Sequence, residues 1–132
     1  MADPVFLTLA EVIEIHRDQI ERYGGQPGLR ELALLQSAVA QPEATFAGEW
    51  LHPDQYQMAA AYAFHVCQNH PFIDGNQRAA LASALVFLEL NGISILDPKG
   101  RLEAAMIHLA SGKISKQEFA NVLRKLPREE LE

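Results

Sequence analysis

The spacing of apolar residues predicts a chain built of helices. Apolar side chains recur every three to four positions in successive segments, which is the period of one helix face. Two of these segments are rich in alanine and apolar on most sides, so we expect them to pack against each other at the centre of a bundle. The expected helices span residues 9–23, 31–40, 56–69, 77–90, 102–109 and 116–126. The pattern therefore predicts an all-α fold, a compact bundle of about six helices.

Two capping boxes support the expected helix starts. Thr8 is followed three residues later by Glu11, and Ser115 by Glu118, so each hydroxyl can accept from a first-turn N–H while the glutamate accepts from the cap residue. Between the second and third helices, residues 41–54 have no helical period and form the longest irregular stretch of the chain. Segments of this kind often carry function.

The segment 70–78, between the two Ala-rich helices, has the residues of a shaped loop. Pro71 lacks an N–H and disfavours helical dihedrals at His70, so the preceding helix is expected to end there. The aromatic Phe72 is expected to anchor the loop in the core, and Gly75 permits a positive φ or a close approach to a ligand. We therefore expect Pro71 and Phe72 to set the shape of a loop that ends one helix and starts the next.

The same loop carries the groups of a phosphate-transfer site. An imidazole such as that of His70 can take a proton from a hydroxyl, and the carboxylate of Asp74 is a hard oxygen ligand of the type that Mg²⁺ accepts beside phosphates. The guanidinium of Arg78 suits phosphate. The N–H groups expected to be free for anions at the helix start are those of Gly75, Asn76 and Gln77. Each residue alone fits an ordinary turn, cap or surface ion pair, but their coincidence in one loop favours a site.

Composition narrows the class of protein. The chain of 132 residues is most simply one domain, residues 1–132, and its hydrophobic fraction of 48% suits a packed core. A net charge of −6 disfavours binding to nucleic acid or to an anionic membrane. No secretory signal or membrane-spanning run is expected, which makes the cytoplasm the default location. The single cysteine, Cys67, excludes an intramolecular disulfide, and its spacing to His65 and His70 disfavours a zinc site.

Three features outside the loop receive structural interpretations. Arg30 follows a Gly-Leu pair at the end of a turn and is expected to brace a loop or form an ion pair. His16 lies between the two faces of the first helix and is expected to be structural. The charged residues 128–132 are predicted to form a frayed tail.

The loop resembles the signature loop of the Fic/Doc (Fido) family, which reads approximately His-Pro-Phe-x-Asp/Glu-Gly-Asn-Gly/Lys-Arg. The matching residues are His70, Pro71, Phe72, Asp74, Gly75, Asn76 and Arg78. Segments similar to the death-on-curing (Doc) branch are 6–8, 23–25, 28–30, 34–38 and 87–92. The resemblance implies one Fido domain with the motif loop between two central helices and a flap that aligns the target peptide. By this resemblance the flap, which can hold a short β-hairpin, comprises Thr45, Phe46, Ala47, Gly48, Glu49 and Trp50; Trp50 equally fits a packing role.

The resemblance also implies a function, that of a Doc-type toxin from a type II toxin–antitoxin module. Such a toxin would use ATP and Mg²⁺ to transfer a phosphate to a Ser or Thr hydroxyl of a translation factor, with elongation factor Tu as the implied target, and so block translation. His70 would be the base and Asp74 the metal ligand. The phosphate-binding set would be Gly75, Asn76, Gln77 and Arg78. The chain lacks the self-inhibitory helix pattern of some Fic proteins, so an antitoxin chain in trans is the implied regulator.

Two departures from the family pattern leave alternatives open. Fic adenylyltransferases usually carry a second arginine where this chain has Leu81, and the Doc branch also has leucine there, which favours phosphate transfer. Doc relatives commonly have lysine, and adenylylating relatives glycine, where this chain has the uncharged Gln77. We therefore predict phosphate transfer, with AMP transfer to a protein hydroxyl or a catalytically attenuated binding module as alternatives.

Overall fold

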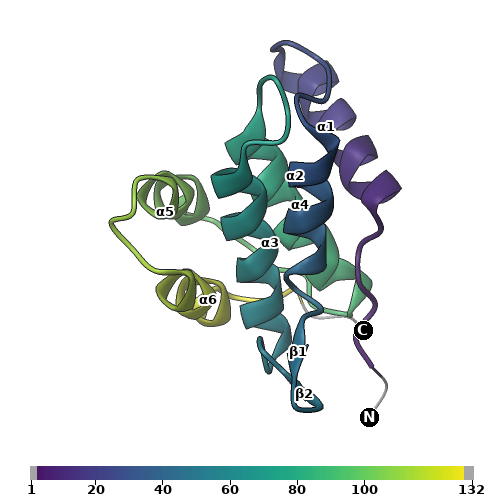
Figure 1. Ribbon diagram of the computed structural model, residues 1–132. Helices are drawn as coiled ribbons and strands as arrows, with labels where there is room; N and C mark the ends of the chain where they lie inside the picture. Colours follow the sequence, from purple (N-terminus) through teal and green to yellow (C-terminus); the bar gives the residue numbers. More distant parts are fainter. Residues whose placement is uncertain (1–2, 130–132) are drawn as a thin grey trace.

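A computed structural model describes residues 3–129 of the chain, and the all-α prediction is confirmed (Figure 1). Six helices and one two-stranded hairpin lie within these residues. In order, they are α1 (Leu9–Tyr23), α2 (Leu32–Ala40), β1 (Thr45–Phe46), β2 (Glu49–Trp50), α3 (Gln55–Asn69), α4 (Asn76–Leu90), α5 (Arg101–Ala110) and α6 (Lys116–Lys125). The observed helix bounds therefore lie close to those expected from apolar spacing.

The central pair is α3 and α4, the two Ala-rich helices, which pack most extensively against each other. Ala59, Ala63, Ala80 and Ala84 are fully buried, and small side chains of this kind allow helices to approach closely. The helices α1 and α2 cover one side of this pair, and α5 and α6 cover the other (Figure 1). The bundle thus surrounds α3 and places the loop that follows it at one end of the molecule.

Both predicted capping boxes form. The Thr8 hydroxyl accepts from the N–H of Glu11 at 3.1 Å, and the Ser115 hydroxyl accepts from that of Glu118 at 3.0 Å, with each glutamate bonded back to the cap residue. Gly24 ends α1 with a positive φ of 86°, as expected from the paired glycines. These local signals explain why the helix ends could be located from sequence.

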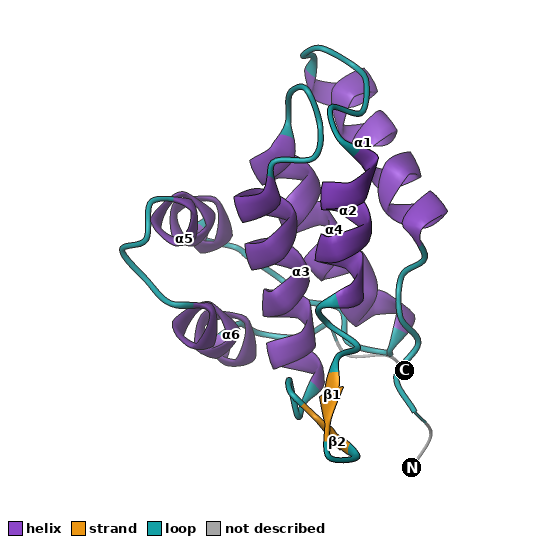
Figure 2. Ribbon diagram, in the orientation of Figure 1, coloured by secondary structure: helices purple, strands orange, loops and turns teal. Residues whose placement is uncertain are grey.

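A short hairpin occupies residues 45–50, the part of the irregular segment in which the family resemblance implied one (Figure 2). Thr45 pairs with Trp50 and Phe46 with Glu49, and the two turn residues between them both have positive φ, as a tight hairpin turn requires. The Trp50 ring packs 5.5 Å from the ring of Phe6, whereas Phe46 is 75% exposed. Trp50 therefore anchors the base of the hairpin and Phe46 stands at its free end.

The chain after α6 differs from the predicted frayed tail. Arg128 forms an isolated antiparallel bridge with Ile95, donates to the hydroxyl of Tyr56 and stacks over the same ring. The N–H of Glu129 donates to the carbonyl of Ser94 at 2.8 Å. The prediction was wrong for these two residues because tertiary pairing holds them; residues 130–132 lie outside the described part of the chain.

None of the helices in the described range 3–129 has the length and apolar character needed to cross a membrane.

Candidate functional site

The motif loop connects α3 to α4 through two left-handed residues. The helix α3 ends at Asn69, and His70 takes φ 52° and ψ 51°, a region that costs a residue with a Cβ roughly 1–3 kcal/mol. Gly75 takes φ 73° and ψ 22° as the N-cap of α4. The expected end of α3 and the expected conformational role of Gly75 are both confirmed. The strained residue is the one predicted to carry the catalytic imidazole, and its ring is exposed.

Residues 25–31, which connect α1 to α2, brace this loop along its length. The N–H groups of Arg30 and Glu31 both donate to the carbonyl of Pro71, at 2.7 and 3.0 Å, and Leu29 forms an antiparallel bridge with Phe72. The N–H of Ile73 donates back to the carbonyl of Gly28 at 3.1 Å. The motif loop therefore has a paired backbone on this side, although neither segment belongs to a named strand.

The Arg30 side chain holds the turn at His70. Its Nε donates to the carbonyl of His70 at 2.8 Å and its Nη2 to the carbonyl of Asn69 at 3.2 Å. These carbonyls end α3, where helices leave acceptors without intrahelical partners. The bracing role expected for Arg30 is confirmed, and its partner is the strained residue of the loop.

Phe72 fixes the middle of the loop in the core, as expected. It is 1% exposed, and both of its backbone groups bond to the side chain of Asn76: the N–H donates to Oδ1 and the carbonyl accepts from Nδ2, each at 2.9 Å. The ring stacks on that of His16, with centroids 3.8 Å apart and planes 2° from parallel. His16 is 4% exposed and its Nε2 lies 2.7 Å from the carbonyl oxygen of Asp74. His16 therefore has the structural role that was expected, and it supports the motif loop through Phe72 and the carbonyl of Asp74.

The Asp74 carboxylate is exposed but not free of contacts. Oδ2 accepts from the N–H of Gln26 at 3.0 Å and Oδ1 from the N–H of Gly75 at 2.9 Å. These two hydrogen bonds, that of Gln26 first, hold the pKa of Asp74 below its usual value, so the group is ionised at neutral pH. A side chain at position 25 would meet Oδ2, because a Cβ on Gly25 would lie 2.8 Å from it.

The helix start offers fewer free donors than expected. The N–H of Gly75 is bonded to Asp74, and the side chain of Asn76 is bonded to Phe72, so neither faces a ligand freely. The N–H groups of Asn76 and Gln77 belong to the first turn of α4, where backbone donors have no intrahelical acceptor. Arg78 is exposed; its Nη1 donates to the carbonyl of Gly24 at 3.2 Å, and its guanidinium lies 5.2 Å from the centre of the Tyr23 ring.

A cleft of about 880 Å³ brings the predicted catalytic, metal-binding and phosphate-binding residues together. From the motif segment it is lined by His70, Ile73, Asp74, Gly75, Asn76, Gln77 and Arg78. The wall opposite the motif loop comes from α5, through Glu103, Met106, Ile107 and Ala110, and Leu81 of α4 also lines the cleft. No local signal identified the α5 residues, because only the packing of α5 against α3 and α4 brings them there.

The hairpin does not lie beside this cleft. In Figure 1 the strands β1 and β2 are at the end of α3 opposite to the motif loop, and residues 45–50 are absent from the cleft lining. A helix of 15 residues is about 22 Å long, so α3 separates the two. The predicted hairpin forms, but it lies away from the motif cleft, and the target-aligning role expected for Thr45–Trp50 stays a prediction. The segment paired with the motif loop is instead residues 25–31.

His65, Cys67 and His70, whose spacing disfavoured a zinc site, do not lie around one point. His65 Nε2 lies 3.1 Å from the ammonium nitrogen of Lys116, whereas Cys67 and His70 line the motif cleft. Among residues 3–129, no group of three or more His, Cys, Asp or Glu side chains is placed to hold a metal ion. A cation at Asp74 would therefore need other oxygen ligands, such as phosphate oxygens or water.

Comparisons with known proteins identify the family. Residues 6–88 match the Fic/DOC family. The chain is 34% identical over 116 residues to "Protein kinase doc" of Escherichia phage P1, covering 88% of this chain and 90% of the relative. It is 40% identical over 73 residues to "Toxin Doc" of Mycolicibacterium smegmatis, covering 55% and 56%. The matched region contains the whole motif loop and the segment that braces it. The chain belongs to the Fic/DOC family.

Proposed function

We propose that this chain is a Doc-type toxin that transfers a phosphate from ATP to a Ser or Thr hydroxyl of a translation factor. The observation that carries the proposal is the convergence of His70, Asp74 and Arg78 on one cleft at the start of a helix. The relatives' names, a protein kinase and a toxin, support the same activity and biological role. Elongation factor Tu is the target that the family resemblance favours.

The base in this proposal is His70. A general base must reach the proton that it removes, and the exposed ring of His70 is presented into the cleft by a left-handed turn. The two bonds from Arg30 to the carbonyls at this turn offset the cost of the strained backbone. The imidazole would accept the proton of the target hydroxyl as its oxygen attacks the terminal phosphorus of ATP. The bond from that phosphorus to the bridging oxygen would break, and ADP would leave.

The residues present fit a magnesium nucleotide. The cleft has the size of a small-molecule site, and the Asp74 carboxylate is exposed and ionised, so it would hold Mg²⁺ while still accepting its two backbone bonds. The ion, when bound, neutralises charge on the phosphate oxygens. The phosphates would be held by the N–H groups of Asn76 and Gln77 and by the guanidinium of Arg78.

Leu81 favours transfer of phosphate over transfer of AMP. It lines the cleft one helical turn after Arg78, where adenylylating relatives place an arginine that holds terminal phosphates. An apolar side chain cannot fix the nucleotide in that orientation. AMP transfer therefore remains the alternative within enzymes, and the identity of the adduct separates the two.

The target would lie against residues 25–31. These residues pair with the motif loop through one edge of their backbone, and an extended peptide can add to the opposite edge of such a segment by main-chain hydrogen bonds. The exposed side chains of Leu29 and Ile73, 37% and 54% exposed, would contact it. This segment, and not the hairpin, would then set the position of the acceptor hydroxyl beside His70.

The proposed toxin function also implies a partner and a location in the cell. The regulator would be an antitoxin chain acting in trans at the motif cleft, and the toxin would act in the cytoplasm, where translation factors reside. Neither nucleic acid nor membrane is a partner in this proposal, since the net charge of −6 repels both.

The experiment that tests the function uses ATP labelled in either the terminal or the innermost phosphate. The chain is incubated with each label, Mg²⁺ and a cell lysate, and labelled proteins are identified. Label from the terminal phosphate alone, on a translation factor, is the expected result. Label from the innermost phosphate would establish AMP transfer instead, and no protein labelling would contradict both.

A second candidate, an attenuated binding module, rests on Gln77. This side chain is exposed in the cleft and carries no charge where Doc relatives commonly have lysine. The variant Gln77→Lys adds a cation beside the phosphates and is expected to raise ATP affinity by roughly three- to tenfold. Target labelling that appears only in this variant would make the present chain the attenuated form.

A further inference from the structure

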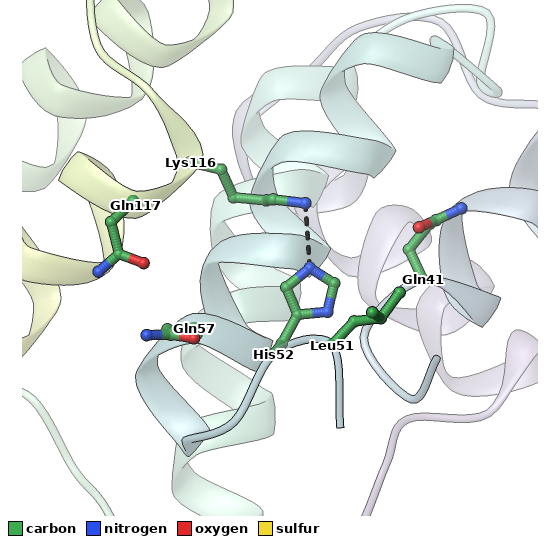
Figure 3. A pocket seen from close by; sticks show the side chains of 6 residues that line it. All are labelled: Gln41, Leu51, His52, Gln57, Lys116 and Gln117. Carbon is green, nitrogen blue, oxygen red and sulfur yellow. Dashed lines mark hydrogen bonds between the residues drawn. The ribbon is translucent and has the colours of Figure 1, made fainter. Parts of the chain in front are cut away.

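A cluster of three basic side chains lies outside the motif cleft, where α6 begins beside α3. The ammonium nitrogen of Lys116, the first residue of α6, lies 3.0 Å from Nε2 of His52 and 3.1 Å from Nε2 of His65. Figure 3 shows the contact of Lys116 with His52 at the edge of a pocket of about 300 Å³. His52 follows the hairpin in sequence and His65 belongs to α3, so this basic cluster joins three segments of the chain.

The contact requires both imidazoles to be neutral. An ammonium can only donate hydrogen bonds, so each Nε2 accepts from Lys116 and each neutral ring carries its proton on Nδ1. A proton added to Nε2 of either His52 or His65 would point at the ammonium, which cannot accept it. The hydrogen bond from Lys116 to that ring would be lost, and two positive charges would face each other. The arrangement therefore tolerates one positive charge and not two.

No carboxylate compensates a second charge in the part of the cluster that faces the pocket. The other residues that line the pocket are neutral: Gln41, Leu51, Gln57 and Gln117. The two acidic residues at the nearby helix starts are engaged elsewhere. Asp54, the N-cap of α3, pairs with Arg124 at 3.0 Å, and Glu118 of α6 accepts from the N–H of Ser115 at 3.0 Å.

The remaining charged and titratable groups on the segments around the cluster are exposed. They are Glu43 and Glu49 between α2 and α3, Glu103 and His108 of α5, Lys113 between α5 and α6, and Lys125 of α6. Among residues 3–129, no carboxylate contributes to the pKa of Lys116 or of either histidine in the cluster. A proton taken up by one of the imidazoles would therefore stay uncompensated as long as the cluster is closed.

Burial acts in the same direction as the charge of Lys116. Burial first, and Lys116 second, lower the pKa of His52. Burial, Lys116 and His52, in that order, lower the pKa of His65 to about 4. Because these pKa values are below that of a histidine in the unfolded chain, about 6.5, the stability that the closed cluster contributes is fully present above the unfolded pKa. It is lost as pH falls from there through the folded pKa.

We propose that the basic cluster is an acid-opened clasp. Near neutral pH it holds the first turn of α6 and the segment at His52 against α3, and it releases both when an imidazole takes up a proton. The second half of α6 would stay in place, because Leu123 is fully buried and Arg124 is paired with Asp54. The clasp is separate from the motif cleft and does not depend on the proposed transfer activity.

Amide hydrogen exchange followed by NMR on the full chain tests the clasp with an internal control. The N–H of Phe119 donates to the carbonyl of Ser115 at 3.0 Å at the start of α6, and the N–H of Val12 donates to the carbonyl of Thr8 at 3.1 Å at the start of α1. Phe119 and Val12 are both fully buried, and both helix starts have a capping box with a glutamate. Acid therefore acts on the two starts alike except through the clasp.

Protection factors of the two amides are compared at pH about 7 and about 5. Each histidine that takes up a proton on opening raises the open population by up to about tenfold for each pH unit below its unfolded pKa. Protection at Phe119 should therefore fall at least about tenfold more than protection at Val12. An equal fall at the two amides, or no fall at Phe119, would overturn the proposal.

Glutamine variants test whether the histidines are the groups that take up the protons, because an amide oxygen can accept from Lys116 and does not titrate. His65→Gln should reduce the additional fall at Phe119 at least about threefold, whereas the control His108→Gln, at an exposed histidine of α5, should leave it within about twofold. An unchanged fall in His65→Gln, or equal reductions in the two variants, would contradict the clasp.

The second imidazole provides an independent variant. His52→Gln should also reduce the additional fall at Phe119, and it replaces His65→Gln if that variant does not fold; an unchanged fall would again contradict the clasp. His70→Ala, outside the cluster, should show the fall of the wild type. Loss of protein transfer and loss of the clasp are therefore distinguishable.

Discussion

The two segments that flank α2, residues 25–31 and the hairpin at 45–50, contact different parts of the molecule. Residues 25–31 pair with the motif loop through backbone hydrogen bonds, and Arg30 adds its side chain to the end of α3. The hairpin at 45–50 pairs with itself and anchors through the contact of Trp50 with Phe6. The first segment is irregular yet fixes the site, whereas the second has regular strands yet stands apart from it. The presence of regular β-strands therefore does not indicate which segment holds the motif loop in place.

The same contrast appears in the side chains. Around the motif loop, hydrogen bonds hold the backbone of His70 and Phe72, which leaves the imidazole of His70 exposed. At the other end of α3, side chains bond to one another, as Lys116 does to two imidazoles. A reactive group needs a fixed backbone and a free side chain, and only the motif end meets both conditions.

Among the substitutions at the motif loop, loss of the Asn76 side chain should lower the stability of the fold most. Asn76→Ala leaves the backbone N–H and carbonyl of the buried Phe72 without partners, so we expect the free energy of unfolding to fall by about 2–4 kcal/mol. Chemical denaturation measures the change. The neighbouring, exposed Gln77→Ala is the control and should change stability by less than about 0.5 kcal/mol. Equal effects at the two positions would contradict the bracing role.

Arg30→Met should impair transfer more than it impairs folding. The substitution keeps much of the side-chain length but removes both donors to the carbonyls of Asn69 and His70, so the left-handed turn can relax. We expect kcat for protein labelling to fall roughly tenfold while KM for ATP changes little, and the free energy of unfolding to fall by about 1 kcal/mol.

The control for Arg30 is Arg22→Met, which removes an exposed arginine paired with Asp18 on α1. It should leave kcat unchanged. A kcat for Arg30→Met equal to that of the wild type would show that the turn at His70 holds its shape without the guanidinium.

Acid should weaken the loop through Asp74. Its pKa in the folded chain is below the unfolded value, so its contribution to stability is fully present above the unfolded pKa and is lost as pH falls through the folded pKa. Denaturation midpoints measured from pH about 5 downward should fall less steeply in Asp74→Asn than in the wild type. Asp3→Asn, in the exposed N-terminal segment, should retain the slope of the wild type. Identical slopes in the wild type and Asp74→Asn would contradict the two backbone bonds.

The smallest effect is expected at the hairpin. Phe46→Ala removes a ring that is 75% exposed and remote from the cleft, so stability should change by less than about 0.5 kcal/mol and the KM for the target should remain the same. Steady-state labelling with purified target measures the KM. A severalfold rise in KM would return the target-aligning role to the hairpin.

Most of the fold could be predicted because its signals are local. Capping boxes at Thr8 and Ser115, the proline after His70 and the glycine before Asn76 each act within a few residues of the helix ends that they determine. The motif residues were likewise found together because they adjoin in sequence. Their convergence on one cleft follows from the shortness of the loop.

The remainder required tertiary contacts. The distance between the hairpin and the motif loop could not be predicted, because no local pattern shows that α2 and α3 run antiparallel and carry the hairpin to the far end of α3. The bonding of the Asn76 side chain to Phe72, the stacking of His16 on the same residue and the wall from α5 also join distant residues. Apolar spacing indicates which face of a helix is buried, but not which loop it supports.

The central claim is that a braced loop presents His70 as the base for phosphate transfer, and the mass of a purified target tests it most directly. Elongation factor Tu is incubated with ATP, Mg²⁺ and either the wild-type chain or His70→Ala, with the helical content of the variant checked by circular dichroism. The account predicts the mass of one added phosphate with the wild type and no added mass with His70→Ala. Equal phosphate addition by the variant, or an adduct with the mass of a nucleotide, would contradict it.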